Sequence, residues 1–260
     1  MKNVIAIAER ELKAYFTSPI AYAVLTIFVF LSGLFFQIIL SQIVREVQLR
    51  DTQGQRFGTG PQPVDMPGFI SQSFLGTLSV ILLFMLPMIT MALFSEEKRR
   101  GTIELLLTAP LTDLEVVLGK FLAAVSFYGI MLITTFVPIS ILFIYSDPAA
   151  GPILTGYLGL FLYGVSLLAV GLFISTLTEN QIIAGAASFA IAMMLWLVDA
   201  LAANATSTTK AVLTHLSLLG HLDDFIKGVL STSHIIFYLS LTTLGLFLTY
   251  RSIESMRWRG

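Results

Sequence analysis

Cysteine is absent from this 260-residue sequence, and charged side chains make up only 12% of it. A soluble domain carries about 25% charged residues, roughly twice this share. The lack of cysteine excludes disulfides, zinc–thiolate sites, iron–sulfur clusters and thiol nucleophiles. The net charge of −1, without a basic stripe, also argues against a nucleic-acid-binding protein.

Lysine and arginine are missing altogether between Phe121 and Thr209, while 56% of the whole chain is hydrophobic. A soluble protein could not leave so long an uncharged stretch in contact with water. The composition therefore excludes a soluble enzyme and a disordered chain, and predicts a protein that crosses a lipid bilayer several times.

Six apolar runs have the length of about 20 residues that a helix needs to cross the hydrocarbon layer. The runs are continuously apolar rather than alternating, which favours helices over barrel strands. The first is too long for a signal peptide and follows a mixed-charge segment, so we count it as a span. We predict an all-α polytopic membrane protein with spans at Ile20–Leu40, Phe74–Phe94, Phe121–Tyr145, Tyr157–Leu177, Ile182–Ala202 and His234–Tyr250.

An even number of spans places both chain ends on one side of the membrane. That side carries ten basic residues, against five on the other side. The positive-inside rule then places both termini in the cytoplasm. The bias is moderate, because the first outer loop holds three of the five arginines and lysines.

We expect residues 1–260 to form a single transmembrane domain. Residues 3–17 carry Ile5, Leu12 and Tyr15 at helical spacing, which predicts an interfacial helix, or else an extension of the first span. The first outer loop, Arg50 to Gly68, is rich in glycine, proline and glutamine and is expected to be irregular. Residues 203–233 show an amphipathic pattern interrupted at Gly220, which predicts an outer, re-entrant helical hairpin.

The most informative segment is residues 95–120, on the predicted cytoplasmic side. Glu96 can pair with Arg100 one helical turn later, and Gly101 can end that helix as a left-handed cap. Thr112 and Glu115 form a capping box that starts the third span. Between these stops, Thr102 and Glu104 can begin a short helix that ends at Pro110.

Three consecutive leucines, Leu105, Leu106 and Leu107, lie in this short cytoplasmic helix. Such a short element cannot bury apolar side chains on every face. One interpretation is that the helix lies on the membrane or packs on its own bundle. The other is that it fills a groove on a partner protein.

This segment resembles the signature of ABC-2 type transporter permeases, the membrane halves of ATP-driven exporters. In that family it forms the coupling region that docks on the ATPase, and the positions that match here are Glu96, Glu97, Gly101, Thr102, Glu104, Leu105, Leu106, Leu107, Pro110, Gly119 and Lys120. The residues from His221 to Phe225, with Gly228, Tyr238 and Trp258, further resemble the branch with gliding-motility permeases, and a related branch serves copper-enzyme maturation.

The resemblance implies a membrane subunit that is not itself an enzyme and that works with a separate ATPase subunit, which binds Mg-ATP. It also implies a second copy of the chain or a close paralogue, and a place in the inner membrane of a bacterium. The residues agree, because Gly119-Lys120 is followed by Phe121 and position 114 is leucine, so the phosphate-binding loop pattern is not present. No cofactor is expected in this chain.

Other residues were weighed as sites. Met85, Met88 and Met91 recur along one span, where they could line a pathway or bind Cu(I), although such a stripe more often serves packing. Asp199 is the one carboxylate inside a predicted span. The three histidines match no metal motif, so no metal site is predicted. Gly164 and Gly171 would allow close helix packing.

We therefore predict the permease subunit of an ATP-binding-cassette exporter. The alternative is a membrane-anchored component of a motility or signalling assembly, in which the ATPase contact moves a further membrane or periplasmic partner protein. Secondary transport is disfavoured, because the membrane interior holds few ionisable groups that could couple to an ion gradient.

Overall fold

The computed structural model describes residues 2–57, 65–103, 111–203 and 206–257, and this part of the chain is helical with short connections. The helices are α1 (Lys2–Thr17), α2 (Pro19–Phe57), α3 (Met66–Thr90), α4 (Ser95–Arg100), α6 (Asp113–Thr134), α7 (Phe136–Tyr145), α8 (Ala150–Ser175), α9 (Gln181–Ala203), α10 (Ser207–Leu216), α11 (Leu218–Ile226) and α12 (Thr232–Arg257).

Six helical stretches are long and apolar enough to cross a membrane, which confirms the predicted all-α class and the number of spans. They comprise α2, α3 with α4, α6 with α7, α8, α9 and α12. The chain is thus a multi-pass membrane protein.

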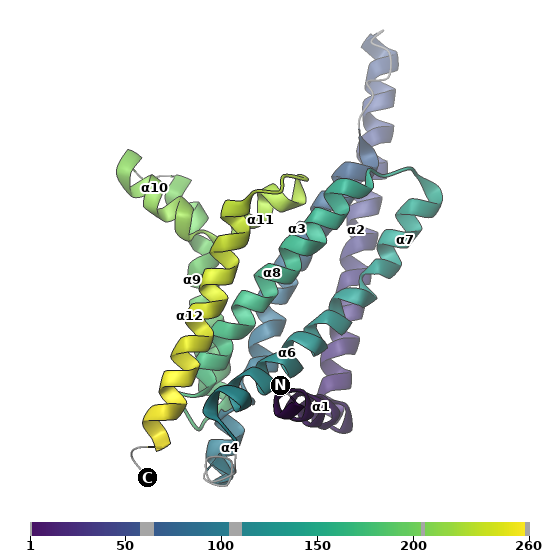
Figure 1. Cartoon of the computed structure of the whole chain (residues 1–260). Coiled ribbons are helices and arrows are strands. Elements are labelled where there is room, and N and C mark those ends of the chain that lie inside the picture. Colours follow the sequence, from purple (N-terminus) through teal and green to yellow (C-terminus); the bar gives the residue numbers. More distant parts are fainter. Residues whose placement is uncertain (1, 58–64, 104–110, 204–205, 258–260) are drawn as a thin grey trace.

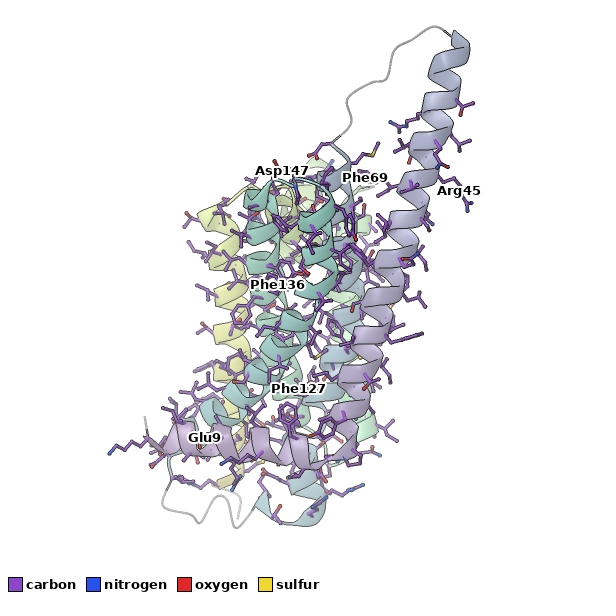
Figure 2. The ribbon with its side chains drawn as sticks, turned by 90° about the vertical axis from the view of Figure 1, so that its right-hand side faces the viewer. Glu9, Arg45, Phe69, Phe127, Phe136 and Asp147 are labelled. Carbon is purple, nitrogen blue, oxygen red and sulfur yellow. The ribbon has the colours of Figure 1, made fainter. Side chains whose placement is uncertain are left out.

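Both chain ends lie at one end of the bundle, which we call the terminal end (Figure 1). There α1 lies crosswise beneath the spans, with Glu9 on it and Phe127 of α6 above it (Figure 2). The helices α10 and α11 lie at the opposite end, which we call the distal end. The crosswise helix agrees with the predicted interfacial helix, whose place on a membrane surface stays a prediction.

The core is built around α8, whose most apolar window is 72% buried, against 17% for α9. Small residues on α8 let bulky neighbours approach. A Cβ on Gly164 would lie 2.2 Å from the Tyr128 ring, and one on Gly171 would lie 2.2 Å from Thr90 Oγ1. These two glycines therefore serve close packing, as the sequence predicted.

The third span is interrupted at Thr135, between α6 and α7. Pro138 has no N–H to donate to the carbonyl of Thr134, so the helical ladder breaks there. Tyr157 of α8 fills the break, because its hydroxyl donates to the Thr135 carbonyl at 3.0 Å. The span at Phe121–Tyr145 is correct in extent, but it consists of two helices.

The expectation of an irregular loop from Arg50 to Gly68 was wrong at both ends, because α2 continues to Phe57 and α3 begins at Met66. The end of α2 projects beyond the bundle at the distal end (Figure 1), and residues 58–64 of the expected loop lie outside the described residues. The side chains support this extension, since Arg50 pairs with Glu46 one turn earlier and Thr52 Oγ1 donates to the Gln48 carbonyl at 2.7 Å. Loop composition alone did not reveal these local contacts.

The outer segment divides at Ser217, not at Gly220 as predicted. The Ser217 hydroxyl accepts a hydrogen bond from the Gly220 N–H at 2.9 Å, so Ser217 caps α11 and Gly220 lies in its first turn. Val229 and Leu230 follow the end of the helix and are exposed. Whether α10 and α11 re-enter the membrane stays a prediction.

Replacing Gly245 of α12 with alanine should lower stability by about 1–3 kcal/mol, because the helix backbone has no room to accept a methyl group. The new Cβ would lie 2.8 Å from the carbonyl carbon of Ala169 in α8. Thermal unfolding in detergent measures the change. The matched control is Gly33→Ala in α2, where no atom lies within 4 Å, and its stability should be unchanged or higher. Equal stability of both variants would contradict this packing.

Candidate coupling site at the terminal end

The first boundary of the predicted coupling segment is α4, a six-residue helix that follows α3. Gly101 ends it in the left-handed conformation with a φ of 70°, and the Thr102 N–H donates to the Glu97 carbonyl at 3.0 Å. Glu96 pairs with Arg100 across one turn. The predicted stop at Gly101 and the predicted ion pair are both confirmed.

The second boundary is the start of α6. The Glu115 N–H donates to Thr112 Oγ1 at 3.3 Å, and the Thr112 N–H donates to Glu115 Oε2 at 3.1 Å, which confirms the capping box. The hydrogen bond from the Thr112 N–H is the main cause that lowers the pKa of Glu115. Asn3 of α1 also donates to Glu115, so the cap connects α6 to α1.

The predicted docking residues between these boundaries lie outside the described residues, and their role stays a prediction. They are Glu104, Leu105, Leu106, Leu107 and Pro110.

Lys120 of α6 forms the centre of the terminal end. Its side chain is only 2% exposed, and its Nζ lies 2.8 Å from Glu97 Oε1 of α4 and 3.3 Å from Glu11 Oε1 of α1. The same ammonium lies 5.3 Å from the centre of the Phe94 ring. One buried cation therefore joins three helices, and we call this contact the Lys120 joint.

The two carboxylates of the joint differ in how well they are compensated. Burial on its own would raise the pKa of Glu11, but Lys120 and Arg10 outweigh that effect, so the pKa of this carboxyl lies below its ordinary value. Glu97 Oε2 is buried and has no hydrogen-bond partner among the residues that the structure describes. Glu11 is thus shared between Lys120 and the exposed Arg10, at 2.6 Å from the guanidinium, whereas Glu97 has the Lys120 ammonium as its ion-pair partner.

Gly119 of α6 is a point at which α1 packs closely against α6. A Cβ on this residue would lie 2.5 Å from Ile7 Cγ2 and 3.2 Å from the Val4 carbonyl oxygen, so only glycine lets the two helices approach this closely. Gly119 and Lys120 were predicted to contact an ATPase. The structure places both against α1, where they hold helices together, and their part in coupling to an ATPase stays a prediction.

Further polar contacts tie the same region to the remaining spans. Arg257 of α12 pairs with Asp113, the first residue of α6, at 3.1 Å. Lys98 of α4 donates to the Thr176 carbonyl after α8, and the Thr176 hydroxyl donates to Ser252 of α12 at 2.8 Å. The helices α4 and α6 are therefore connected to α8 and α12 as well as to α1.

The other predicted site residues do not converge. Met85 is buried, Met88 is exposed, and Met91 lies beside Gly185 of α9. Asp199 lies at the distal end, with Oδ1 3.4 Å from the place of a Cβ on Gly220. Its carboxylate is thus near the first turn of α11, where the helix dipole favours negative charge. A pathway along these four residues stays a prediction.

Sequence reasoning missed Glu11, Asp113 and Arg257 as members of this site. Glu11 lies in an amphipathic helix whose charged face was expected to meet water. Its partner is more than a hundred positions away, and no local spacing rule connects the two.

Replacing Lys120 with methionine should lower stability on the order of 2 kcal/mol, because Glu97 would lose its buried cation and Glu11 would keep only the more exposed Arg10 as a partner. The matched control is Lys13→Met on the exposed face of α1, which should change stability by less than about 0.5 kcal/mol. Thermal unfolding and limited proteolysis of α1 measure the effect. If both variants unfold alike, the Lys120 joint does not hold the helices together.

Comparison with known proteins gives a consistent result. The sequence profile of the family described as ABC-2 type transporter matches residues 2–200. The probable multidrug ABC transporter permease YbhR of Escherichia coli K12 is 29% identical over 122 residues, which cover 45% of this chain and 31% of that protein. The corresponding permease YbhS is 33% identical over 117 residues, which cover 44% and 30%. The matched region thus spans less than a third of each relative.

Proposed function

Because this chain belongs to the ABC-2 type transporter family, we propose that it is the permease subunit of an ATP-driven exporter. The observation that carries the proposal is the Lys120 joint, because it connects both boundaries of the predicted coupling segment to α1. A force applied between these boundaries would reach three helices through one buried contact.

The energy would come from a separate ATPase subunit. The Gly119-Lys120 pair lies within helix α6 rather than in a loop, and the Lys120 ammonium is held by two carboxylates. This arrangement does not suit a phosphate-binding loop, in which the lysine must be free to reach a nucleotide. We infer that this chain receives mechanical work and does not hydrolyse ATP itself.

Transmission would pass from residues 104–110 into the flanking helices. On one side, α4 follows directly on α3, and on the other side, α6 continues into α7 across the membrane. Closure of two ATPase subunits would shift the two boundaries together. Since Lys120 resists their separation, the helices would tilt as a unit rather than bend individually.

We place the terminal end in the cytoplasm of a bacterium, because it carries the larger share of basic residues. The distal end with α10 and α11 would then face the outside. We further propose that a second copy or a paralogue completes the pathway. The relatives named as probable multidrug permeases, together with the uncharged spans, suggest an amphipathic small molecule as cargo.

The wild-type protein, purified gently from its native membrane, should carry an ATPase subunit in about equal amount. Replacing Leu105, Leu106 and Leu107 with serine should lower its recovery at least about 10-fold, since an interface that loses its apolar anchors loses more than about 1.4 kcal/mol. Quantitative mass spectrometry of the purified complex measures the ratio.

The matched control is Lys120→Arg, which keeps the cation inside the bundle and should leave ATPase recovery unchanged. Absence of an ATPase from the wild-type preparation in several mild detergents would contradict the proposed function. Equal recovery with the triple serine variant would contradict the docking role of the leucines.

A further inference from the structure

Two histidines face each other at the distal end. The Nδ1 atom of His221 in α11 lies 2.6 Å from the Nδ1 atom of His234 in α12. The outer nitrogens also face polar atoms, since His221 Nε2 lies 3.3 Å from the carbonyl oxygen of His215 and His234 Nε2 lies 2.9 Å from Asp224 Oδ2. The His221 ring is buried, so these contacts cannot readily be replaced by water.

The number of protons in this contact is limited. Asp224 accepts from the Nε2–H of His234, which leaves the Nδ1 of a neutral His234 as an acceptor. His221 must then supply the hydrogen between the two Nδ1 atoms. One added proton can go to His221 Nε2, which faces the His215 carbonyl. With both rings fully protonated, two N–H groups and two positive charges would meet, and the contact would be lost.

The surroundings disfavour a second positive charge. The Phe237 ring centre lies 4.1 Å from that of His221, and Phe225 lies 6.0 Å from His234. Neither α3 nor α8, which pack against α11, carries a lysine, arginine, histidine, aspartate or glutamate. The titratable side chains there are the Tyr157 and Tyr163 phenols of α8.

The charged and titratable groups on the other elements are few. Near the pair they are Asp199 of α9, Lys210 and His215 of α10, Asp223, Asp224 and the following Lys227 at α11, and His234 and Tyr238 of α12. The remaining groups of α12 lie at least about three helical turns further along that helix, toward the terminal end, and are Tyr250, Arg251, Glu254 and Arg257. Asp223 is engaged by Lys227, and the Tyr238 hydroxyl donates to the Leu218 carbonyl at 2.8 Å. Asp224 is therefore the one carboxylate in direct contact with the histidine pair.

Burial lowers the pKa of His221 below its ordinary value, and the neighbouring His234 acts in the same direction, against the His215 carbonyl and Asp224. A lowered histidine pKa means that the docked state prefers the neutral ring. The stability linked to the neutral His221 ring is then complete above about pH 6.5 and decreases as the pH falls toward the lowered value, whereas the contact between the two Nδ1 atoms is lost only when a second proton reaches the pair.

We propose that His221 and His234 form a proton-binding latch that holds α11 against α12 at neutral pH and opens in acid, when both rings are protonated. Opening would loosen the distal end, because α11 also contacts α8 through Thr155, whose hydroxyl donates to the Phe225 carbonyl at 2.8 Å. This inference is independent of the ATPase and of any cargo.

The test uses two nitroxide labels on the full-length protein in nanodiscs. Because the chain has no cysteine of its own, the labels attach only to the cysteines that are introduced. We would label Asp223→Cys on α11 and Tyr145→Cys on α7, both exposed, and measure their distance distribution by pulsed electron resonance. Between about pH 7.5 and about pH 5 the distribution should shift or broaden, with a midpoint below about 6.5.

The variant His234→Gln should abolish this transition, because a glutamine oxygen can accept from His221 Nδ1–H at either pH. The matched control His215→Gln should keep the transition, since the hydrogen bond to His221 comes from the backbone carbonyl of His215. Because the charge of the His215 ring lowers the pKa of His221, its removal should move the midpoint upward and not abolish the transition. An unchanged wild-type distribution, or a transition that persists in His234→Gln, would overturn the proposal. So would a neutral-pH distance that depends on added zinc or on a chelator, because the pair would then be a metal site.

A second measurement needs no variant in the latch. The chain has three histidines, and ¹⁵N spectra of histidine-labelled protein resolve protonated from bare ring nitrogens. At neutral pH the spectra should show a protonated Nδ1 on His221 and an unprotonated Nδ1 on His234. Two bare or two protonated Nδ1 atoms at neutral pH would contradict the latch.

Discussion

The terminal end of this protein depends on one buried ammonium group. Lys120 lies between Glu11 and Glu97, which belong to helices that are far apart in the sequence. Without this cation Glu97 would lose its ion-pair partner and Glu11 would keep only Arg10, so Lys120 is the charge that connects α1 to α4. The neighbouring Gly119 adds a steric condition, because only a residue without a side chain lets Ile7 lie close enough for Glu11 to reach Lys120.

Different kinds of interaction therefore hold the helices together at the two ends of the bundle. At the terminal end, ion pairs connect α1, α4, α6 and α12. At the distal end, aromatic rings and a histidine pair hold α11 in place. Between them, α8 and α12 are packed so closely that the Gly245 backbone of α12 lies directly against the backbone and side chain of Ala169 in α8. A rigid middle with a charged joint at one end suits a protein that converts movement on one side into movement on the other.

Much of this architecture could be predicted from local patterns. The six spans follow from apolar length, and the stops at Gly101 and Thr112 follow from capping chemistry within four residues. Reasoning from composition failed where side-chain contacts within one turn decide the structure, and reasoning from spacing failed where the partner lies far along the chain. The composition of residues 50–57 suggested a loop, although α2 continues through them, and Gly220 was taken as a break although the Ser217 hydroxyl sets the start of α11. The Lys120 joint could not be predicted, because no spacing rule connects Glu11 to Lys120.

The most direct test of the account is a charge exchange across the joint, read out as transport driven by ATP in proteoliposomes that contain the co-purified ATPase. Lys120→Glu alone should abolish transport while the ATPase stays bound, because three carboxylates would then meet at one place. Adding Glu97→Lys returns a cation to the same site and should restore most of the transport. If the double variant is no better than Lys120→Glu, or if Lys120→Glu alone transports normally, the joint does not carry the coupling and the account is contradicted.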